Sequence, residues 1–160
     1  MKTQILPEVL QKAVRAKMQE YYQDDLTGAF TNDYSAFVAQ KSRYVILLRD
    51  AVLTADSQTQ EVSIAIDLHD RLGQFFEICR HENDYILYGE LEIIRLSASF
   101  EVLWSFSARD IFVDPDGASA FETDFDGIYL MDWLGWHYRI SYDGKLINEY
   151  CQNTCNRGKL

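Results

Sequence analysis

Acidic side chains are concentrated between residues 114 and 126. Five carboxylates fall within these thirteen residues, and no basic residue lies among them. Carboxylate oxygens are the ligands that hard divalent cations such as Ca²⁺ prefer. The spacing of an EF-hand calcium loop is not met, because glycine occupies the fourth position of each possible loop instead of the sixth. Aspartate and glycine also collect in ordinary solvated turns, so we assign no metal. The acids are Asp114, Asp116, Glu122, Asp124 and Asp126.

The apolar segment Ile111-Phe112-Val113 runs directly into Asp114-Pro115-Asp116-Gly117. This arrangement resembles the nucleophile motif of the haloacid dehalogenase phosphatases. The resemblance implies that Asp114 attacks phosphorus, that Asp116 handles the leaving-group proton, and that Mg²⁺ offsets the charge. In that family the motif follows an early strand of a parallel α/β sheet, whereas here only 46 residues follow Asp114. A metal-dependent hydrolase that uses the Asp-rich loops is therefore kept as an alternative function.

A soft-metal site can also be drawn from the sequence. Two neighbours on one predicted strand face, Cys79 and His81, would join Cys151 and Cys155, whose three-residue spacer is within the range of structural zinc sites. The opposing interpretation is a buried Cys79, an exposed histidine and two thiols on a mobile tail. No nucleophile elbow or zinc-protease motif is present, so we assign no catalytic residue and no cofactor.

Aromatic residues near the C-terminus are the remaining chemical feature. One face of a single predicted strand carries Trp136, Tyr138, Ile140 and Tyr142. Such rings can form a stacking platform or anchor an interface, but cross-strand aromatic pairs are also a common way to stabilise a sheet. We therefore expect most of them in the core. As anchors for a partner we select Tyr129, Trp133 and Trp136.

The composition bears on partners. The chain has 160 residues and a formal charge of −10, and all of the excess acid lies after residue 60. Nucleic-acid binding needs a basic footprint, so we expect none. A basic protein is the better match, because complementary charge speeds encounter. The 48% hydrophobic content predicts a folded globular chain.

The cysteine count and the apolar segments bear on the compartment and on assembly. Three cysteines, no secretory signal and no apolar run of about 20 residues predict a cytoplasmic protein that does not enter a membrane. Residues 128–133 are apolar on both faces of the predicted strand. Such a strand is either central between two layers or faces a partner, which includes a second copy of the chain.

The periodicity of apolar residues predicts the elements. Residues 7–23 repeat every three or four positions and predict a helix, and a second helix is expected over residues 33–40. After residue 42 the period becomes 2, which predicts strands over residues 44–54, 61–69, 74–82, 84–89, 91–97, 101–107, 110–113, 128–133, 136–142 and 145–150. The strongest hairpin signal is Asp143-Gly144, for which we expect a two-residue loop.

Gaps this short cannot carry parallel crossovers, so neighbouring strands should pair antiparallel. We expect an α+β fold with one or two N-terminal helices and a meander of about eight to ten strands, as a curved sheet or partly closed barrel. The chain would be one domain, with a helical part (1–41), a sheet part (42–150) and a flexible tail (151–160). Residues 94–106 resemble a blade of quinoprotein-type β-propellers. Because a propeller needs 4–8 blades and the chain could supply two or three, we interpret this segment as a simple hairpin.

Together these features favour a non-catalytic interaction protein that presents an acidic strand and loop surface to a basic partner. Small immunity or inhibitor proteins that neutralise cationic toxins use this physics. Besides the hydrolase, a β protein that binds a small molecule at the mouth of a curved sheet remains a further alternative.

Overall fold

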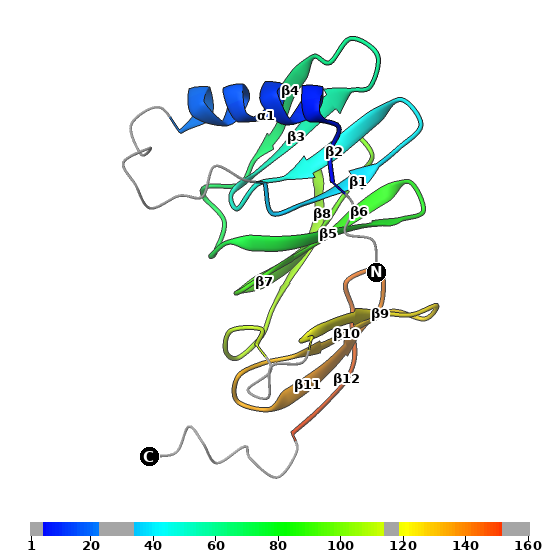
Figure 1. Cartoon of the computed structure of the whole chain (residues 1–160). Coiled ribbons are helices and arrows are strands. Elements are labelled where there is room, and N and C mark those ends of the chain that lie inside the picture. Colours follow the sequence, from blue (N-terminus) through cyan, green and yellow to red (C-terminus); the bar gives the residue numbers. More distant parts are fainter. Residues whose placement is uncertain (1–4, 23–33, 114–118, 152–160) are drawn as a thin grey trace. The chain divides into compact units, whose positions relative to one another are not determined.

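The computed structural model describes residues 5–22, 34–113 and 119–151 (Figure 1). Within them the chain forms one helix and twelve strands, and the strands make three four-stranded antiparallel sheets. The fold is therefore mostly β. The chain divides into two compact units, residues 1–70 and 71–160. Among the described residues, no helix has the length and apolar character needed to cross a bilayer.

The first unit contains the helix and the first sheet. The helix, α1 (Glu8–Tyr21), confirms the element predicted from the apolar spacing. The strands follow in the order β1-β2-β3-β4, each paired with its neighbour in sequence. They are β1 (Ala36–Ala39), β2 (Arg43–Leu47), β3 (Ala51–Asp56) and β4 (Val62–Asp67). The expected single strand over 44–54 is thus a hairpin of two strands.

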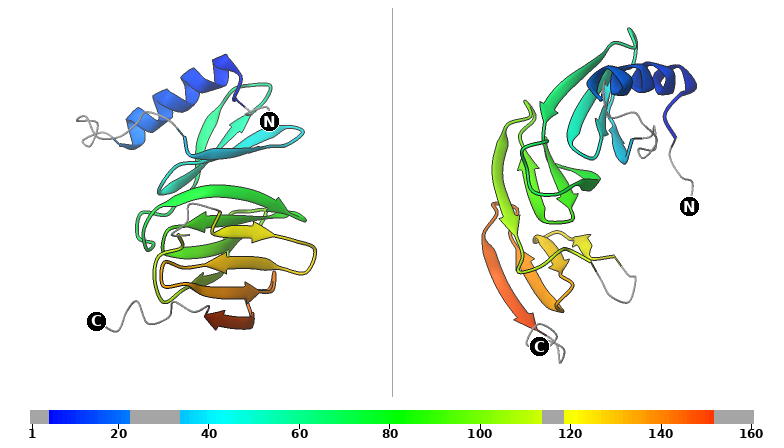
Figure 2. Two further views of the ribbon diagram at one scale, coloured as in Figure 1. Left: turned by 60° about the horizontal axis from the view of Figure 1, so that its bottom comes forward. Right: turned by 90° about the vertical axis from the view of Figure 1, so that its left-hand side faces the viewer.

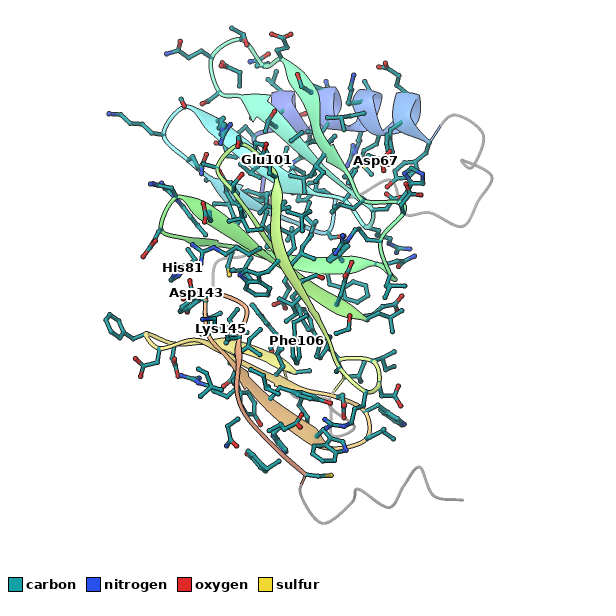
Figure 3. The ribbon with its side chains drawn as sticks, turned by 180° about the vertical axis from the view of Figure 1, so that it is seen from behind. Asp67, His81, Glu101, Phe106, Asp143 and Lys145 are labelled. Atoms are coloured by element: carbon teal, nitrogen blue, oxygen red, sulfur yellow. The ribbon has the colours of Figure 1, made fainter. Side chains whose placement is uncertain are left out.

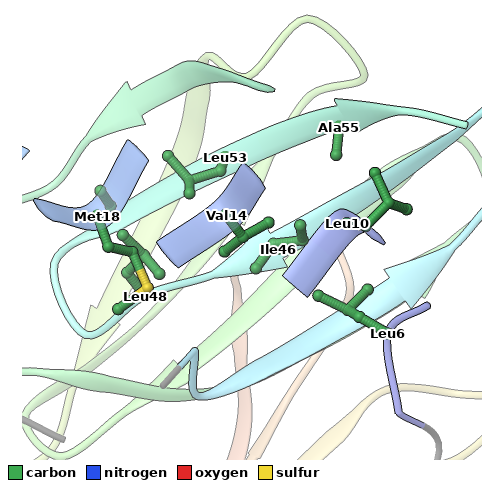
Figure 4. Close-up of a cluster of buried hydrophobic side chains, with 9 residues drawn as sticks. Leu6, Leu10, Val14, Met18, Ile46, Leu48, Leu53 and Ala55 are labelled. Carbon is green, nitrogen blue, oxygen red and sulfur yellow. The ribbon is translucent and has the colours of Figure 1, made fainter. Parts of the chain in front are cut away.

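Helix α1 packs on one face of this sheet (Figure 4). Its buried side chains recur at every fourth position, which places them on a single stripe. They contact buried residues of β2, β3 and the turn between these strands. The helix and loop contribute Leu6, Leu10, Val14 and Met18, and the sheet side contributes Ile46, Leu48, Ala51, Leu53 and Ala55.

The second helix predicted over residues 33–40 is wrong. Its C-terminal half forms strand β1, which pairs with β2 from Ala36↔Leu47 to Ala39↔Tyr44. A tight turn joins the two strands, with the N–H of Gln40 bonded to the carbonyl of Arg43 at 2.9 Å. Pairing with β2 provides the hydrogen bonds of β1, so tertiary context overrides the weak local helical pattern.

The second unit contains two sheets. One has the order β5-β6-β7-β8 and the other β9-β10-β11-β12, and Figure 2 shows β9 to β12 lying side by side in yellow to red. The strands are β5 (Phe75–His81), β6 (Asp84–Gly89), β7 (Glu92–Leu96), β8 (Val102–Ser107), β9 (Phe121–Thr123), β10 (Ile128–Met131), β11 (Trp136–Ile140) and β12 (Leu146–Cys151). The predicted strand over 110–113 does not form, and β9 was not predicted.

The expected single meander, curved or partly closed, is therefore corrected to three separate sheets. Antiparallel pairing of consecutive strands is confirmed, but the chain leaves the sheet after every fourth strand. In the second unit the two sheets share one cluster of buried residues, so they stack instead of continuing edge to edge. Stacking buries apolar faces that a single twisted sheet would leave open. The cluster comprises Ile86, Tyr88, Ile93, Phe112, Ala120, Ile128, Leu130, Tyr138 and Ile140.

Candidate interaction site

The turn between β9 and β10 is built around Asp124. Its carboxylate accepts the backbone N–H groups of Asp126 (2.9 Å) and Gly127 (3.1 Å), and it forms an ion pair with Arg139 on β11. The hydrogen bond from Arg139, followed by those from the backbone, lowers the pKa of Asp124 to about 2. This side chain is therefore committed to holding the turn. The turn also requires glycine, because a Cβ at Gly127 would lie 2.3 Å from the carbonyl oxygen of Ile140.

The tip of this turn carries a phenyl ring and a second carboxylate. Phe125 is 97% exposed, which is unusual for a large apolar side chain. Asp126 is also exposed, and within the described part of the chain its carboxylate makes no hydrogen bond or ion pair. The two side chains are thus available to a partner.

The turn between β11 and β12 lies at the same end of the sheet. The N–H of Ser141 donates to the carbonyl of Lys145 at 2.8 Å, and the N–H of Gly144 donates to the carbonyl of Ser141 at 3.0 Å. The hairpin predicted at Asp143-Gly144 is confirmed, but its loop has three residues, with Gly144 at φ +82°. A Cβ on Gly144 would approach the indole of Trp104 to 2.6 Å, so this loop is closely packed on β8.

Aromatic and charged groups join this loop to the first sheet of the unit. The imidazole of His81, at the end of β5, stacks on the ring of Tyr142 with centroids 3.5 Å apart and planes at 9°. The carbonyl of Tyr142 accepts hydrogen bonds from Arg95 (2.7 Å) and from the indole of Trp104 (2.9 Å). Arg95 also forms an ion pair of 2.7 Å with Asp84. The two sheets are therefore fixed against each other at this end.

A cleft of about 560 Å³ opens among these two turns and the turn between β5 and β6, which contains Glu82. Figure 3 shows His81 and Asp143 beside each other at this place. We name it the turn cleft, and its lining residues are His81, Glu82, Arg95, Asp124, Phe125, Tyr142 and Asp143. Of these, Asp124 was predicted to bind a partner, whereas His81 was considered only as a zinc ligand and Tyr142 only as part of an aromatic face. The sequence signal that could have found Glu82, Phe125 and Asp143 is their position in turns or at the ends of predicted strands, whereas Arg95 lies within β7 and gives no such signal.

The predicted anchors lie elsewhere. Trp133 is 46% exposed in the turn between β10 and β11, at the other end of β10 from Asp124. Trp136 begins β11 at that same end, partly buried against the cluster, with the guanidinium of Arg109 stacked 3.7 Å from its ring centroid. The length of β10 separates these indoles from the acidic turn by roughly 10 Å or more. The anchors and the acids thus form two surfaces.

Two further predicted residues lie on the outer face of the last sheet. Glu122 and Tyr129 are cross-strand neighbours of β9 and β10, on the face that points away from the buried cluster. The hydroxyl of Tyr129 is hydrogen-bonded to the ring of His137, which in turn stacks on Tyr150 at 4.6 Å. Asp114 and Asp116 lie outside the described residues.

The structure also bears on the metal alternatives. In the part of the chain that the structure describes, no group of three or more His, Cys, Asp or Glu side chains could hold a metal ion. Burial raises the pKa of the Cys79 thiol to about 11, so without a metal the group is protonated near neutral pH. Cys151 is disulfide-bonded, and Cys155 lies outside the described residues.

The aromatic face of β11 belongs to the core. Tyr138 and Ile140 are members of the buried cluster, and Trp136 and Tyr142 pack against it. Tyr138 and Ile140 are therefore not part of a stacking platform, because neither side chain is exposed to a ligand.

No protein-family model matches the sequence, and no relative is found among curated proteins. Similar folds are found among solved structures. The AfRom2 CNH domain has a TM-score of 0.52 and 13% identity, over 74% of this chain and 40% of that one. The N-terminal domain of Nup159 has a TM-score of 0.55 and 8% identity, over 84% and 36%. The same values are found for a complex of S. cerevisiae Dbp5 bound to Nup159, Gle1, IP6 and ADP.

These similarities show a mostly β fold with propeller-like neighbours. Propeller blades are four-stranded sheets, and each sheet of this chain has four consecutive strands. The segment over residues 94–106, interpreted from sequence as a simple hairpin, lies in β7 and β8 of one such sheet. The chain spans 40% or less of the length of these solved chains.

Proposed function

We propose that this chain is a non-catalytic interaction module whose acidic second unit binds a basic protein. The observation that carries the proposal is the end of the second unit, where exposed turns present carboxylates together with the 97% exposed Phe125. A large exposed apolar side chain beside unpaired charge is typical of a binding surface.

The charge distribution supports a cationic partner. Residues 71–160 contain fifteen acidic and eight basic residues, a net charge of −7. Two of the described cations near the acidic turns are engaged within the chain, since Arg139 pairs with Asp124 and Arg95 with Asp84, while Lys145 is exposed beside Asp143. The charge that remains for a partner is therefore negative, which attracts a basic surface and speeds its encounter.

The similar folds agree with a role in binding. One of the solved neighbours is described as a complex in which Dbp5 is bound to Nup159. We extend the proposal to an immunity or inhibitor role, in which the acidic surface covers the basic site of its partner. This role needs desolvated carboxylates opposite basic residues and an aromatic anchor between them.

The test is affinity capture with the full chain from the cells that produce it, followed by mass spectrometry. We expect one basic protein in an equimolar amount, with an affinity that falls steeply as ionic strength rises from about 0.05 to about 0.5 M. Recovery of the bait alone, or of a partner whose affinity is independent of salt, would contradict the proposal.

A further inference from the structure

The turn cleft has the chemistry to receive one particular side chain. From its residues we infer that the cleft binds an arginine side chain presented by a peptide segment of a protein partner. The inference rests on the proposed function and adds to it the position and the chemical class of the ligand.

The charge of the lining is negative. Three carboxylates, those of Glu82, Asp124 and Asp143, face one guanidinium, that of Arg95. Arg95 is neutralised by Asp84, and Asp124 is neutralised by Arg139. Arg80 donates its hydrogen bond to the backbone carbonyl of Glu82 and not to the carboxylate.

Two carboxylates are therefore left at the rim. Within the described residues, the side chains of Glu82 and Asp143 make no hydrogen bond or ion pair, and both residues are exposed. A cation that enters the cleft would find two carboxylates that form no ion pair within the described residues, although the exposed Lys145 follows Asp143 by two residues. Charge complementarity thus selects a cationic occupant.

The walls are aromatic. The stacked pair of His81 and Tyr142 forms one side, and Phe125 contributes an exposed ring to the lining. A planar guanidinium stacks on such rings and binds carboxylates through paired hydrogen bonds, whereas an ammonium is a strongly hydrated point charge. Arginine therefore fits this lining better than lysine does.

The size of the cleft indicates a peptide instead of a free small cation. A volume of about 560 Å³ exceeds what one guanidinium fills and lies in the range of sites that hold several connected groups. The cleft is formed by turns at the end of the unit, where a partner's loop can approach without displacing a strand.

Trp104, which is hydrogen-bonded to a lining residue, supplies a reporter. The indole N–H of Trp104 donates to the carbonyl of Tyr142 at 2.9 Å, directly behind the cleft wall. Its NMR signal should move when the wall is occupied. The indole signals of Trp133 and Trp136, at the other end of β10, serve as internal references.

The experiment titrates the isotope-labelled full chain with the capped pentapeptide Gly-Gly-Arg-Gly-Gly. The same peptide with lysine, or with citrulline, the neutral analogue of arginine, provides the comparison. We expect saturable shifts at the Trp104 indole and at His81, Tyr142 and Asp143. The lysine peptide should bind with lower affinity than the arginine peptide, and the citrulline peptide with an affinity lower by about tenfold or more. Equal affinity for arginine and citrulline, or shifts spread away from the cleft, would overturn the inference.

Variants test the lining. The double variant Glu82→Gln with Asp143→Asn removes the two rim charges. Its affinity for the arginine peptide should fall by about tenfold. Phe125→Ser removes the exposed ring and should also lower the affinity for the arginine peptide. Glu101→Gln is the matched control, because Glu101 is exposed on the same unit outside the cleft, and it should bind as the original chain does. Equal losses in the control and in the double variant would contradict the inference.

Failure of this inference differs from failure of the proposed function. If capture recovers a basic protein whose affinity is unchanged in the double variant, and the arginine peptide leaves the cleft signals in place, the cleft assignment is wrong and the proposed function stands. If capture recovers no basic protein while the arginine peptide binds the cleft, the proposed protein partner is wrong and the site is retained.

Discussion

The hydroxyl of Tyr138 donates a hydrogen bond of 2.6 Å to the carboxylate of Asp132, and both residues are buried in the second unit. The other oxygen of Asp132 accepts the backbone N–H of Trp136 at 3.0 Å. The carboxylate therefore ties the turn between β10 and β11 to the centre of β11.

Replacement of this carboxylate should cost stability. Asp132→Ala removes both hydrogen bonds and leaves buried donors without their acceptor, so the free energy of unfolding should fall by about 2–4 kcal/mol. Urea denaturation followed by tryptophan fluorescence measures the change. Asp132→Asn keeps the shape and one acceptor oxygen and should cost less, and equal losses for the two variants would contradict this account.

The ion pair of Asp124 and Arg139 predicts a pH dependence. The pKa of Asp124 is lowered from 3.8 to about 2, so the stability that its ionised form contributes is present above pH 3.8 and is lost as pH falls toward 2. Carboxyl carbon shifts of Asp124 measured by NMR should titrate with a midpoint near 2. In Arg139→Gln the midpoint should rise toward the ordinary value, and an unchanged midpoint would show that the backbone bonds alone cause the shift.

The partly buried thiol of Cys79 should react slowly. Desolvation, and to a lesser extent the charge of Glu77, raise its pKa to about 11, so the reactive thiolate is scarce near neutral pH. Iodoacetamide at pH 8, with the alkylated peptides identified by mass spectrometry, should modify Cys79 slowly in the folded chain and rapidly in urea. Equal rates in both conditions would mean that the fold neither shields the thiol nor raises its pKa.

Packing of α1 predicts a large effect of truncating its buried face. Leu10 is 3% exposed, and Leu10→Ala should lower the stability of the first unit by about 2–5 kcal/mol. Val9, its neighbour, is 54% exposed, so Val9→Ala is the matched control and should cost little. Denaturation followed by circular dichroism measures both, and similar losses would place the helix on the wrong face.

Local periodicity was sufficient for some elements of the fold. The four-residue repeat of Leu10, Val14 and Met18 predicts α1, and the Asp143-Gly144 pair predicts the last hairpin. Both depend on neighbours in the sequence. The second helix was wrong because residues 36–39 satisfy their backbone in pairing with β2, a partner that a local pattern does not reveal.

The candidate site could be predicted only in part. Asp124 and Asp126 attract notice as clustered acids, but the role of Asp124 in holding its own turn depends on Arg139 of another strand. The turn cleft joins His81 to Tyr142, residues far apart in the sequence that meet because two sheets stack. The order of stacking, and the break after every fourth strand, are set by burial across sheets and leave no signature in the spacing along one strand.

Each strand of the described chain pairs only with strands adjacent to it in sequence. Closing such short loops costs little chain entropy, so the ladders can form early and close to the speed of local hairpins. During synthesis, each group of four strands can pair as soon as it leaves the ribosome, before the following group has been made. What remains is the docking of the β5–β8 ladder on the β9–β12 ladder in the second unit, through side chains such as Ile86 and Tyr138.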